Sequence, residues 1–269
     1  MTRRKFVPAA AAAASAAAAA AAAGAALQGQ TTAKPCVFEL RVVHQRNSPD
    51  NQKQRMTDLL RDATLPALLK YGAGPVGFFN STIAPGGPFT VALISYPSLA
   101  AMEEIRAKMN ADAKYAKQIE AFNAMAGLGY ERLDSSLLRA FPRVPAIEVP
   151  PTDAKRPGRI FELRTYESNN SATLRRKIKM FEEGGEIAIF RKLGMQVVFF
   201  AETIVGQNMP SLTYMLGYDD LAAREAAWKA FGKDPEWAKL RVQPGLSDAE
   251  IVSNISNILL SPLPFSPIR

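Results

Sequence analysis

The chain has 269 residues, enough for one large domain or two ordinary ones, and its glycine and proline contents are ordinary for a globular protein. Its net charge of +8 is a modest basic excess with no lysine- or arginine-rich run interleaved with aromatic residues, so nucleic acid is not an expected partner. One cysteine and one histidine exclude a disulfide within the chain and a metal site rich in these residues, and we expect neither a metal nor a cofactor.

The first 30 residues are predicted to be an export signal. Thr2-Arg3-Arg4-Lys5-Phe6-Val7 resembles the twin-arginine motif, and an alanine-rich run from Ala9 to Ala26 follows it. Ala23-Gly24-Ala25 has the small residues of a cleavage site. Alanine is too weakly apolar to predict a transmembrane helix. We therefore expect cleavage, no membrane span afterwards, and a periplasmic or secreted protein, with a membrane anchor or helical tail as the alternative.

Residues 36–142 are predicted to form a first domain with the element order β-α-β-β-α-β. Apolar residues recur with period two in the expected strands and at helical spacing in the expected helices. Pro66 is expected to interrupt the first helix, and Ser98 to cap the second. The strands are expected at residues 36–44, 76–83, 89–96 and 133–141.

A second domain is predicted at residues 159–269, after a proline-rich linker at residues 143–158. It repeats the order of elements of the first domain, with a helix interrupted at Gly184-Gly185. Its strands are expected at residues 160–166, 197–203, 212–218 and 251–260.

One sequence motif occurs in both predicted domains. Val37-Phe38-Glu39-Leu40-Arg41 matches Ile160-Phe161-Glu162-Leu163-Arg164 at an offset of 123 residues, and later matches between the two domains have an offset of 122 residues. We interpret this as internal duplication, giving an α+β fold of two tandem ferredoxin-like units. Such a unit leaves one sheet face bare. Stacking two bare faces gives an eight-stranded α/β barrel, either within one chain or between two, and we expect a homo-oligomer.

In each copy of this motif, the period-two alternation places apolar and charged side chains on opposite faces of the predicted strand. Phe38 and Leu40 share one face with Phe161 and Leu163 in the other copy. We expect this face to meet the helices, and His44 to lie on the same side. The charged face is then expected to line the barrel interior with Glu39, Arg41, Glu162, Arg164 and Tyr166.

The second copy resembles the NIPSNAP family. The resemblance rests on Phe161-Glu162-Leu163-Arg164-Thr165-Tyr166, on Gly184-Gly185-Glu186 and on Asp234-Pro235-Glu236-Trp237, and it extends more weakly over the first copy. It implies α/β barrel domains of ferredoxin-like type, whereas the family has no single agreed activity. The wider group of dimeric α/β barrels includes cofactor-independent monooxygenases, a likeness of fold alone.

Three functions follow from these patterns, and whether the chain is an enzyme stays open. In the first, the barrel interior binds a small anionic or amphipathic molecule through Glu39, Arg41, Arg164 and Glu186. In the second, Tyr166 and Glu162 are the catalytic acid and base of a cofactor-independent monooxygenase. In the third, glutamate and arginine pair with each other and seal the interior of a structural assembly module.

Overall fold

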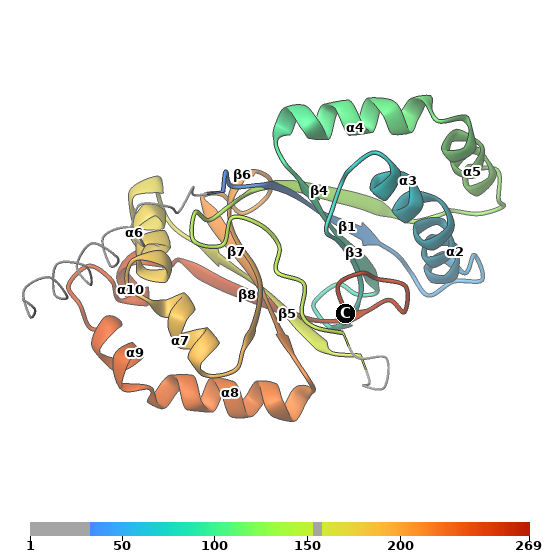
Figure 1. Ribbon diagram of the computed structural model, residues 1–269. Helices are drawn as coiled ribbons and strands as arrows, with labels where there is room; N and C mark the ends of the chain where they lie inside the picture. The colour runs from blue at the N-terminus through green and yellow to red at the C-terminus, as the bar shows by residue number, and fades with distance from the viewer. Residues whose placement is uncertain (1–32, 153–157) are drawn as a thin grey trace, which may run out of the picture. The chain divides into compact units, whose positions relative to one another are not determined.

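Eight antiparallel strands close into one barrel (Figure 1). The computed structural model describes residues 33–152 and 158–269, so the expected export signal at residues 1–30 and residues 153–157 of the expected linker lie outside it. The strands are β1 (Val37–His44), β2 (Val76–Ile83), β3 (Phe89–Tyr96), β4 (Arg132–Ala140), β5 (Ile160–Glu167), β6 (Gln196–Val205), β7 (Ser211–Tyr218) and β8 (Asn254–Pro262).

Each half of the chain supplies four neighbouring strands. The first half contributes the order β4-β1-β3-β2 and the second half β8-β5-β7-β6. Antiparallel pairing of β2 with β8 and of β4 with β6 joins the two sheets. The barrel therefore closes within one chain, which is one of the two arrangements expected from the duplication.

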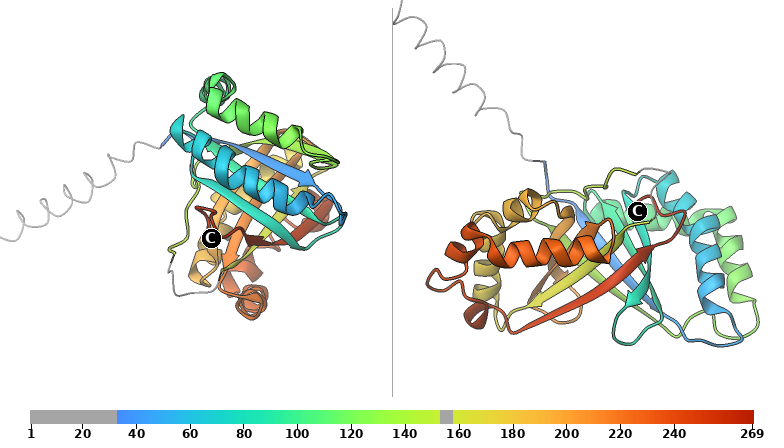
Figure 2. Two further views of the ribbon diagram at one scale, coloured as in Figure 1. Left: turned by 90° about the vertical axis from the view of Figure 1, so that its right-hand side faces the viewer. Right: turned by 90° about the horizontal axis from the view of Figure 1, so that it is seen from below.

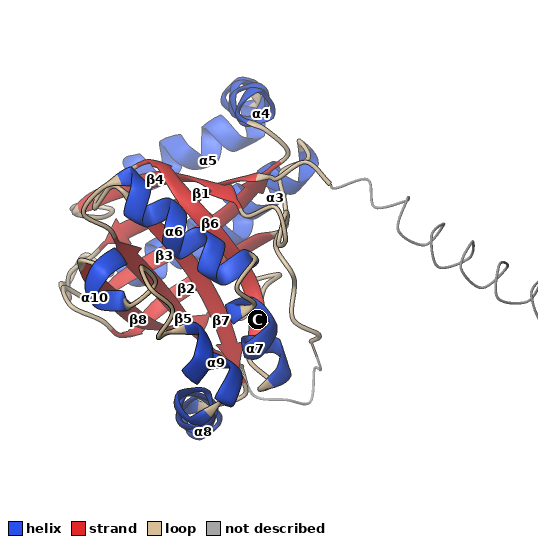
Figure 3. Cartoon of the chain, turned by 90° about the vertical axis from the view of Figure 1, so that its left-hand side faces the viewer, coloured by secondary structure: helices blue, strands red, loops and turns tan. Residues whose placement is uncertain are grey.

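The helices lie outside the barrel, and the two halves place theirs on opposite sides (Figures 2 and 3). The first half contains α2 (Gln52–Leu59), the π-helix η1 (Leu60–Thr64), α3 (Leu65–Lys70), α4 (Leu99–Ala111) and α5 (Ala113–Asn123). The second half contains α6 (Ser171–Glu182), α7 (Glu186–Lys192), α8 (Leu221–Lys233), α9 (Pro235–Leu240) and α10 (Asp248–Ile251). The short helix α10 was not expected, and β8 starts after it.

The first helix of each half is interrupted at the same stage by different means. In the first half a π-helical turn precedes α3, which carries Pro66 in its first turn. In the second half Gly184 and Gly185 separate α6 from α7. A Cβ atom on Gly184 would lie 2.5 Å from the Met180 carbonyl oxygen, and Gly185 has a φ of 90°, so both positions require glycine.

The barrel interior is largely apolar, contrary to the expectation that Glu39, Arg41, Glu162, Arg164 and Tyr166 line it. One buried cluster draws on both halves and includes Phe38, Leu40, Phe161 and Leu163. Two further clusters lie between the sheet and the helices, one in each half. The expected orientation was therefore wrong. Apolar side chains occupy most of the closed barrel, and the charged side chains on the other face of the strands pair with residues of the helices.

Candidate functional site

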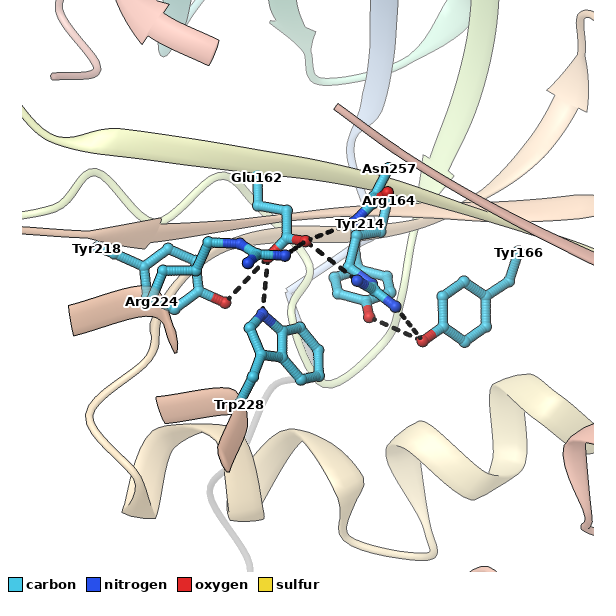
Figure 4. A network of polar contacts seen from close by, with 8 residues as sticks. All are labelled: Glu162, Arg164, Tyr166, Tyr214, Tyr218, Arg224, Trp228 and Asn257. Carbon is cyan, nitrogen blue, oxygen red and sulfur yellow. Dashed lines mark hydrogen bonds and ion pairs between the residues drawn. The ribbon is translucent and has the colours of Figure 1, made fainter. Parts of the chain in front are cut away.

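The second half holds Glu162 in a cage of hydrogen-bond donors between the sheet and α8 (Figure 4). The Glu162 side chain is fully buried. Its Oε1 accepts from Arg164 Nη1 (3.0 Å), Asn257 Nδ2 (3.0 Å) and Arg224 Nη2 (2.6 Å), and its Oε2 accepts from Arg224 Nε (3.0 Å), Trp228 Nε1 (2.8 Å) and Tyr218 Oη (3.4 Å). We call this set the second cage.

Glu162 is held ionised by these partners. Burial alone raises the pKa of its carboxyl, but hydrogen bonds from Arg224 and Asn257 and the charge of Arg164 outweigh burial and leave the pKa below the usual value. With six donors around two oxygens, the carboxylate has little capacity left to accept a substrate proton. The geometry gives Glu162 a role in holding α8 and β8 against β5.

The first half builds a matching cage around Glu39. This buried carboxylate accepts from Arg41 through Nε (2.6 Å) and Nη2 (3.0 Å), from Tyr96 Oη (3.3 Å), from Ser135 Oγ (2.9 Å) and from Arg106. Tyr96 and Ser135 precede Tyr218 and Asn257 by 122 residues, so the first cage repeats the second. The predicted ligand-binding residues Glu39 and Arg41 thus lie in the other half of the chain from Arg164 and Glu186.

Two tyrosines extend the second cage but not the first. Arg164 Nη2 donates to Tyr166 Oη at 3.2 Å, and Tyr214 Oη donates to Tyr166 Oη at 3.2 Å. The Arg164 guanidinium also lies over the Trp228 ring, 4.5 Å from its centroid. Tyr214 was missed by sequence reasoning, although it stands where the first copy has Ala92 and could have been found there.

A buried lysine links this extension to Glu186. Lys177 Nζ lies 3.4 Å from Glu186 Oε2 and 3.2 Å from Asp248 Oδ1, and 5.2 Å from the centroid of the Tyr166 ring. Glu186 is almost completely buried, and burial raises the pKa of its carboxyl to about 7 although the Lys177 charge opposes the rise. The structure therefore places Glu186 near the second cage, but its ion pair is with Lys177, which sequence reasoning missed.

A separate cavity of about 260 Å³ lies inside the barrel, at the end where β1 and β5 finish and β7 begins. One part of its lining is apolar and includes Leu40, Leu138 and Leu163. The polar part comes mainly from the second half, with Thr165, Thr203, Gln207, Asn208, Ser211, Thr213, Ser256 and the cage residue Asn257, and the first half adds His44, Asp134 and Ser136. None of the six predicted site residues is among those that line this cavity in the described part of the chain.

His44 lines the same cavity, so its expected position facing the helices was wrong. Its Nε2 lies 2.9 Å from Asp134 Oδ2, and Arg132 Nε donates to Asp134 Oδ1 at 3.1 Å. Burial opposes ionisation of Asp134, but the hydrogen bonds from His44 and Arg132 keep the pKa of the Asp134 carboxyl below its usual value. The cavity lining therefore includes an ionised carboxylate that already has two partners.

The family model for NIPSNAP matches residues 161–267. The match spans nearly all of the second half of the chain, which is thus similar to a NIPSNAP domain. The resemblance predicted from the second copy is thereby confirmed. A solved NIPSNAP family protein from Agrobacterium tumefaciens, 24% identical, covers 45% of this chain and 100% of its own, with a TM-score of 0.38.

Solved structures also resemble the chain over both halves. A Lactobacillus acidophilus protein provisionally named a monooxygenase is 11% identical, covers 85% of this chain and 94% of its own, and has a TM-score of 0.55. An anthrone oxidase-like protein is 10% identical, covers 86% and 92%, and has a TM-score of 0.50. At such identities the likeness establishes the α/β barrel fold of this chain and no activity. No curated protein matches the chain.

Two further properties concern residues 33–152 and 158–269 only. No helix in these ranges is long and apolar enough to cross a membrane. The same ranges contain no group of three or more histidine, cysteine, aspartate or glutamate side chains placed to hold a metal ion.

Proposed function

We propose that this barrel binds a small amphipathic molecule in its interior cavity. The observation that carries the proposal is the composition of that cavity, which combines an apolar surface with buried hydroxyl groups. Thr203, Ser211 and Thr213 are each at most 5% exposed. Ligand sites in proteins commonly combine a mainly apolar surface with a few fixed polar groups.

The two cages are not the ligand site in this proposal, because their charged groups already pair with one another. An anionic ligand at Arg164 would compete with Glu162, which is fully buried. Breaking a buried ion pair by removing one partner costs about 3–5 kcal/mol. The interior cavity offers binding groups without that cost.

The proposal is tested by screening small amphipathic molecules for those that raise the melting temperature of the full chain. Ser256 is exposed and lines the cavity, so Ser256→Phe should obstruct it without disturbing the core. The matched control is Ile255→Phe, at the adjacent exposed position of β8 that does not line the cavity. We expect stabilisation of the wild type and of Ile255→Phe but not of Ser256→Phe. Equal stabilisation of both variants, or no active compound, would refute the proposal.

A second candidate function is cofactor-independent oxygenation beside the second cage. It is favoured by the hydroxyl groups of Tyr166 and Tyr214 next to Arg164, an arrangement that the first half lacks. Oxygenase names among proteins of similar fold also motivate it. The test is oxygen consumption with an activated phenol: Tyr166→Phe should abolish it, whereas Tyr96→Phe in the first cage should not. Consumption that survives Tyr166→Phe rejects this candidate.

The remaining expectations about the whole molecule are also proposals. The strand orders β4-β1-β3-β2 and β8-β5-β7-β6 support two tandem ferredoxin-like units. We propose twin-arginine export to the periplasm or the medium, which replacement of Arg3 and Arg4 by lysine should block. We also propose self-association, which sedimentation equilibrium of the full chain would detect.

A further inference from the structure

We infer that the interior cavity selects a neutral molecule whose polar end carries hydroxyl or carbonyl groups, in preference to an organic anion or an amine. This inference rests on the proposed function and specifies the ligand class of the same cavity. It replaces the anionic part of the expectation drawn from the sequence.

The cavity presents both donors and acceptors. Thr165 Oγ1 and Thr213 Oγ1 are 3.0 Å apart, and Ser211 Oγ donates to Thr203 Oγ1 at 2.9 Å. A hydroxyl can donate one hydrogen bond and accept two. Each pair uses one hydrogen between its two oxygens, so each retains one O–H donor together with acceptor lone pairs. Hydroxyl and carbonyl groups of a ligand are complementary to this lining.

The fold itself does not require these hydroxyls. Thr165 pairs with Thr213 across β5 and β7, and the equivalent pair in the first half is Val42 with Val91 across β1 and β3. Ser211 corresponds in the same way to Phe89 at an offset of 122. A buried hydroxyl without full hydrogen bonding is less favourable than an apolar group of the same size. The hydroxyls of Thr165, Ser211 and Thr213, which the first half replaces with apolar side chains, are therefore expected to serve a ligand.

The charges around the cavity disfavour an anion. In the described part of the chain, the lining contains neither lysine nor arginine, and its acidic residue is Asp134. A carboxylate entering the cavity would lose hydration without meeting an unpaired cation, and it would approach the Asp134 carboxylate. An ammonium group would face Asp134, but Arg132 and His44 already occupy both of its oxygens. A neutral polar group meets neither penalty.

The apolar side of the cavity limits the rest of the ligand. Leu40, Leu138, Leu163 and Ile258 form the hydrophobic part of the lining. The volume of about 260 Å³ lies below the usual range of about 300–1,000 Å³ for drug-sized ligands. A single aromatic ring or a short alkyl chain with one polar end group fits this description.

The experiment compares three molecules that share one skeleton: 2-phenylethanol, phenylacetate and phenethylamine. Each is titrated into the full chain by isothermal calorimetry at pH 7.5, together with the double variant Thr165→Val/Thr213→Val, which copies the first half. We expect the alcohol to bind at least tenfold more tightly than either charged analogue, and the double variant to weaken its binding about fivefold to tenfold. Thr82→Val, an exposed position of β2 outside the cavity, should leave the affinity unchanged.

The outcomes separate the ligand class from the proposed function. Tighter binding of phenylacetate or phenethylamine that is lost in Ser256→Phe overturns the neutral class but supports a ligand in the cavity. Unchanged affinity of the alcohol in the double variant overturns the role of the hydroxyls. Absence of binding by all three molecules also overturns the inference, whereas the proposed function is judged by the wider screen. Circular dichroism of the double variant checks that its fold is retained.

Discussion

The two halves of the barrel share a carboxylate cage but differ in what surrounds it. Glu39 and Glu162 each bind the arginine two residues further along the strand, a tyrosine from a neighbouring strand and an arginine from the overlying helix. The second half adds the Tyr166–Tyr214 pair and, on the interior face, the Thr165–Thr213 hydroxyl pair, where the first half has Val42 and Val91. The cage that both copies keep stabilises the fold. Residues that serve a specific function are therefore expected where the two copies differ.

The cages also differ in exposure to solvent. The side chains of Arg164 and Arg224 are 14% and 19% exposed, whereas those of Arg41 and Arg106 are 26% and 42% exposed. An ion pair that is shielded from water interacts more strongly, and an unpaired charge there is more costly. The second cage should therefore contribute more to stability than the first.

The largest expected effect comes from removing the second carboxylate. Glu162→Ala leaves Arg164 and Arg224 without their buried partner and should lower the free energy of unfolding by about 3–5 kcal/mol. Glu39→Ala should cost less, about 1–3 kcal/mol, because water reaches its partners. Urea denaturation of the two variants measures both. A larger loss for Glu39→Ala would contradict the ranking of the cages.

The next effect is a pH dependence of stability that comes from Glu186 in the second half. The pKa of Glu186 is about 7 in the folded chain against an ordinary value of 4.5, so the folded state binds more protons between these values. Its stabilising contribution is complete below pH 4.5, falls as the pH rises from 4.5 to 7, and is lost above pH 7, a total loss of about 3 kcal/mol. Glu186→Gln should remove this fall, as measured by denaturation from pH 4 to pH 8. Thr64 holds the equivalent position in the first half. An identical pH profile in the variant would refute the assignment.

A smaller loss is expected from Tyr166→Phe. The variant removes a hydroxyl that binds Arg164 and Tyr214 but leaves the ring in place, so the cost should be about 1 kcal/mol. Arg164 should then bind Glu162 through two nitrogens, as Arg41 binds Glu39. Thermal denaturation and a crystal structure of the variant test this. A loss of unfolding free energy as large as that of Glu162→Ala would contradict this and show that the second cage depends on the Tyr166 hydroxyl.

The smallest effect on stability is expected from Thr213→Val. The first half has Val91 at the equivalent position, so the free energy of unfolding should change by less than about 1 kcal/mol. Chemical denaturation without ligand measures it. A loss above about 2 kcal/mol would mean that the hydroxyl is needed for folding, and the argument for a ligand would lose its basis.

The sequence predicted the elements of the fold better than their orientation. The strands expected at residues 76–83 and 89–96 have these bounds in the structure. Period-two alternation identifies residues that share a face, but both faces of this sheet are covered, so it does not say which face is interior. The deciding contacts come from Arg106, Arg224 and Trp228, more than 60 residues away from the glutamates they bind.

The candidate site was only partly accessible from the sequence for the same reason. Glu162, Arg164 and Tyr166 were expected together because they alternate on one strand, and the structure brings them together. The cavity depends on strands from both halves, so its lining could not be assembled without the barrel closure. The sequence nevertheless contains one indication of the cavity, because Thr165 and Thr213 stand where the first copy has valines.

The most direct test of the central claim is a crystal structure of the full chain with the tightest-binding neutral amphiphile. We expect the polar end of the ligand beside Thr165 and Thr213 and its apolar part against Leu163, with both cages unchanged. Ligand density between β5 and α8 beside Arg164, with the interior cavity empty, would contradict the account.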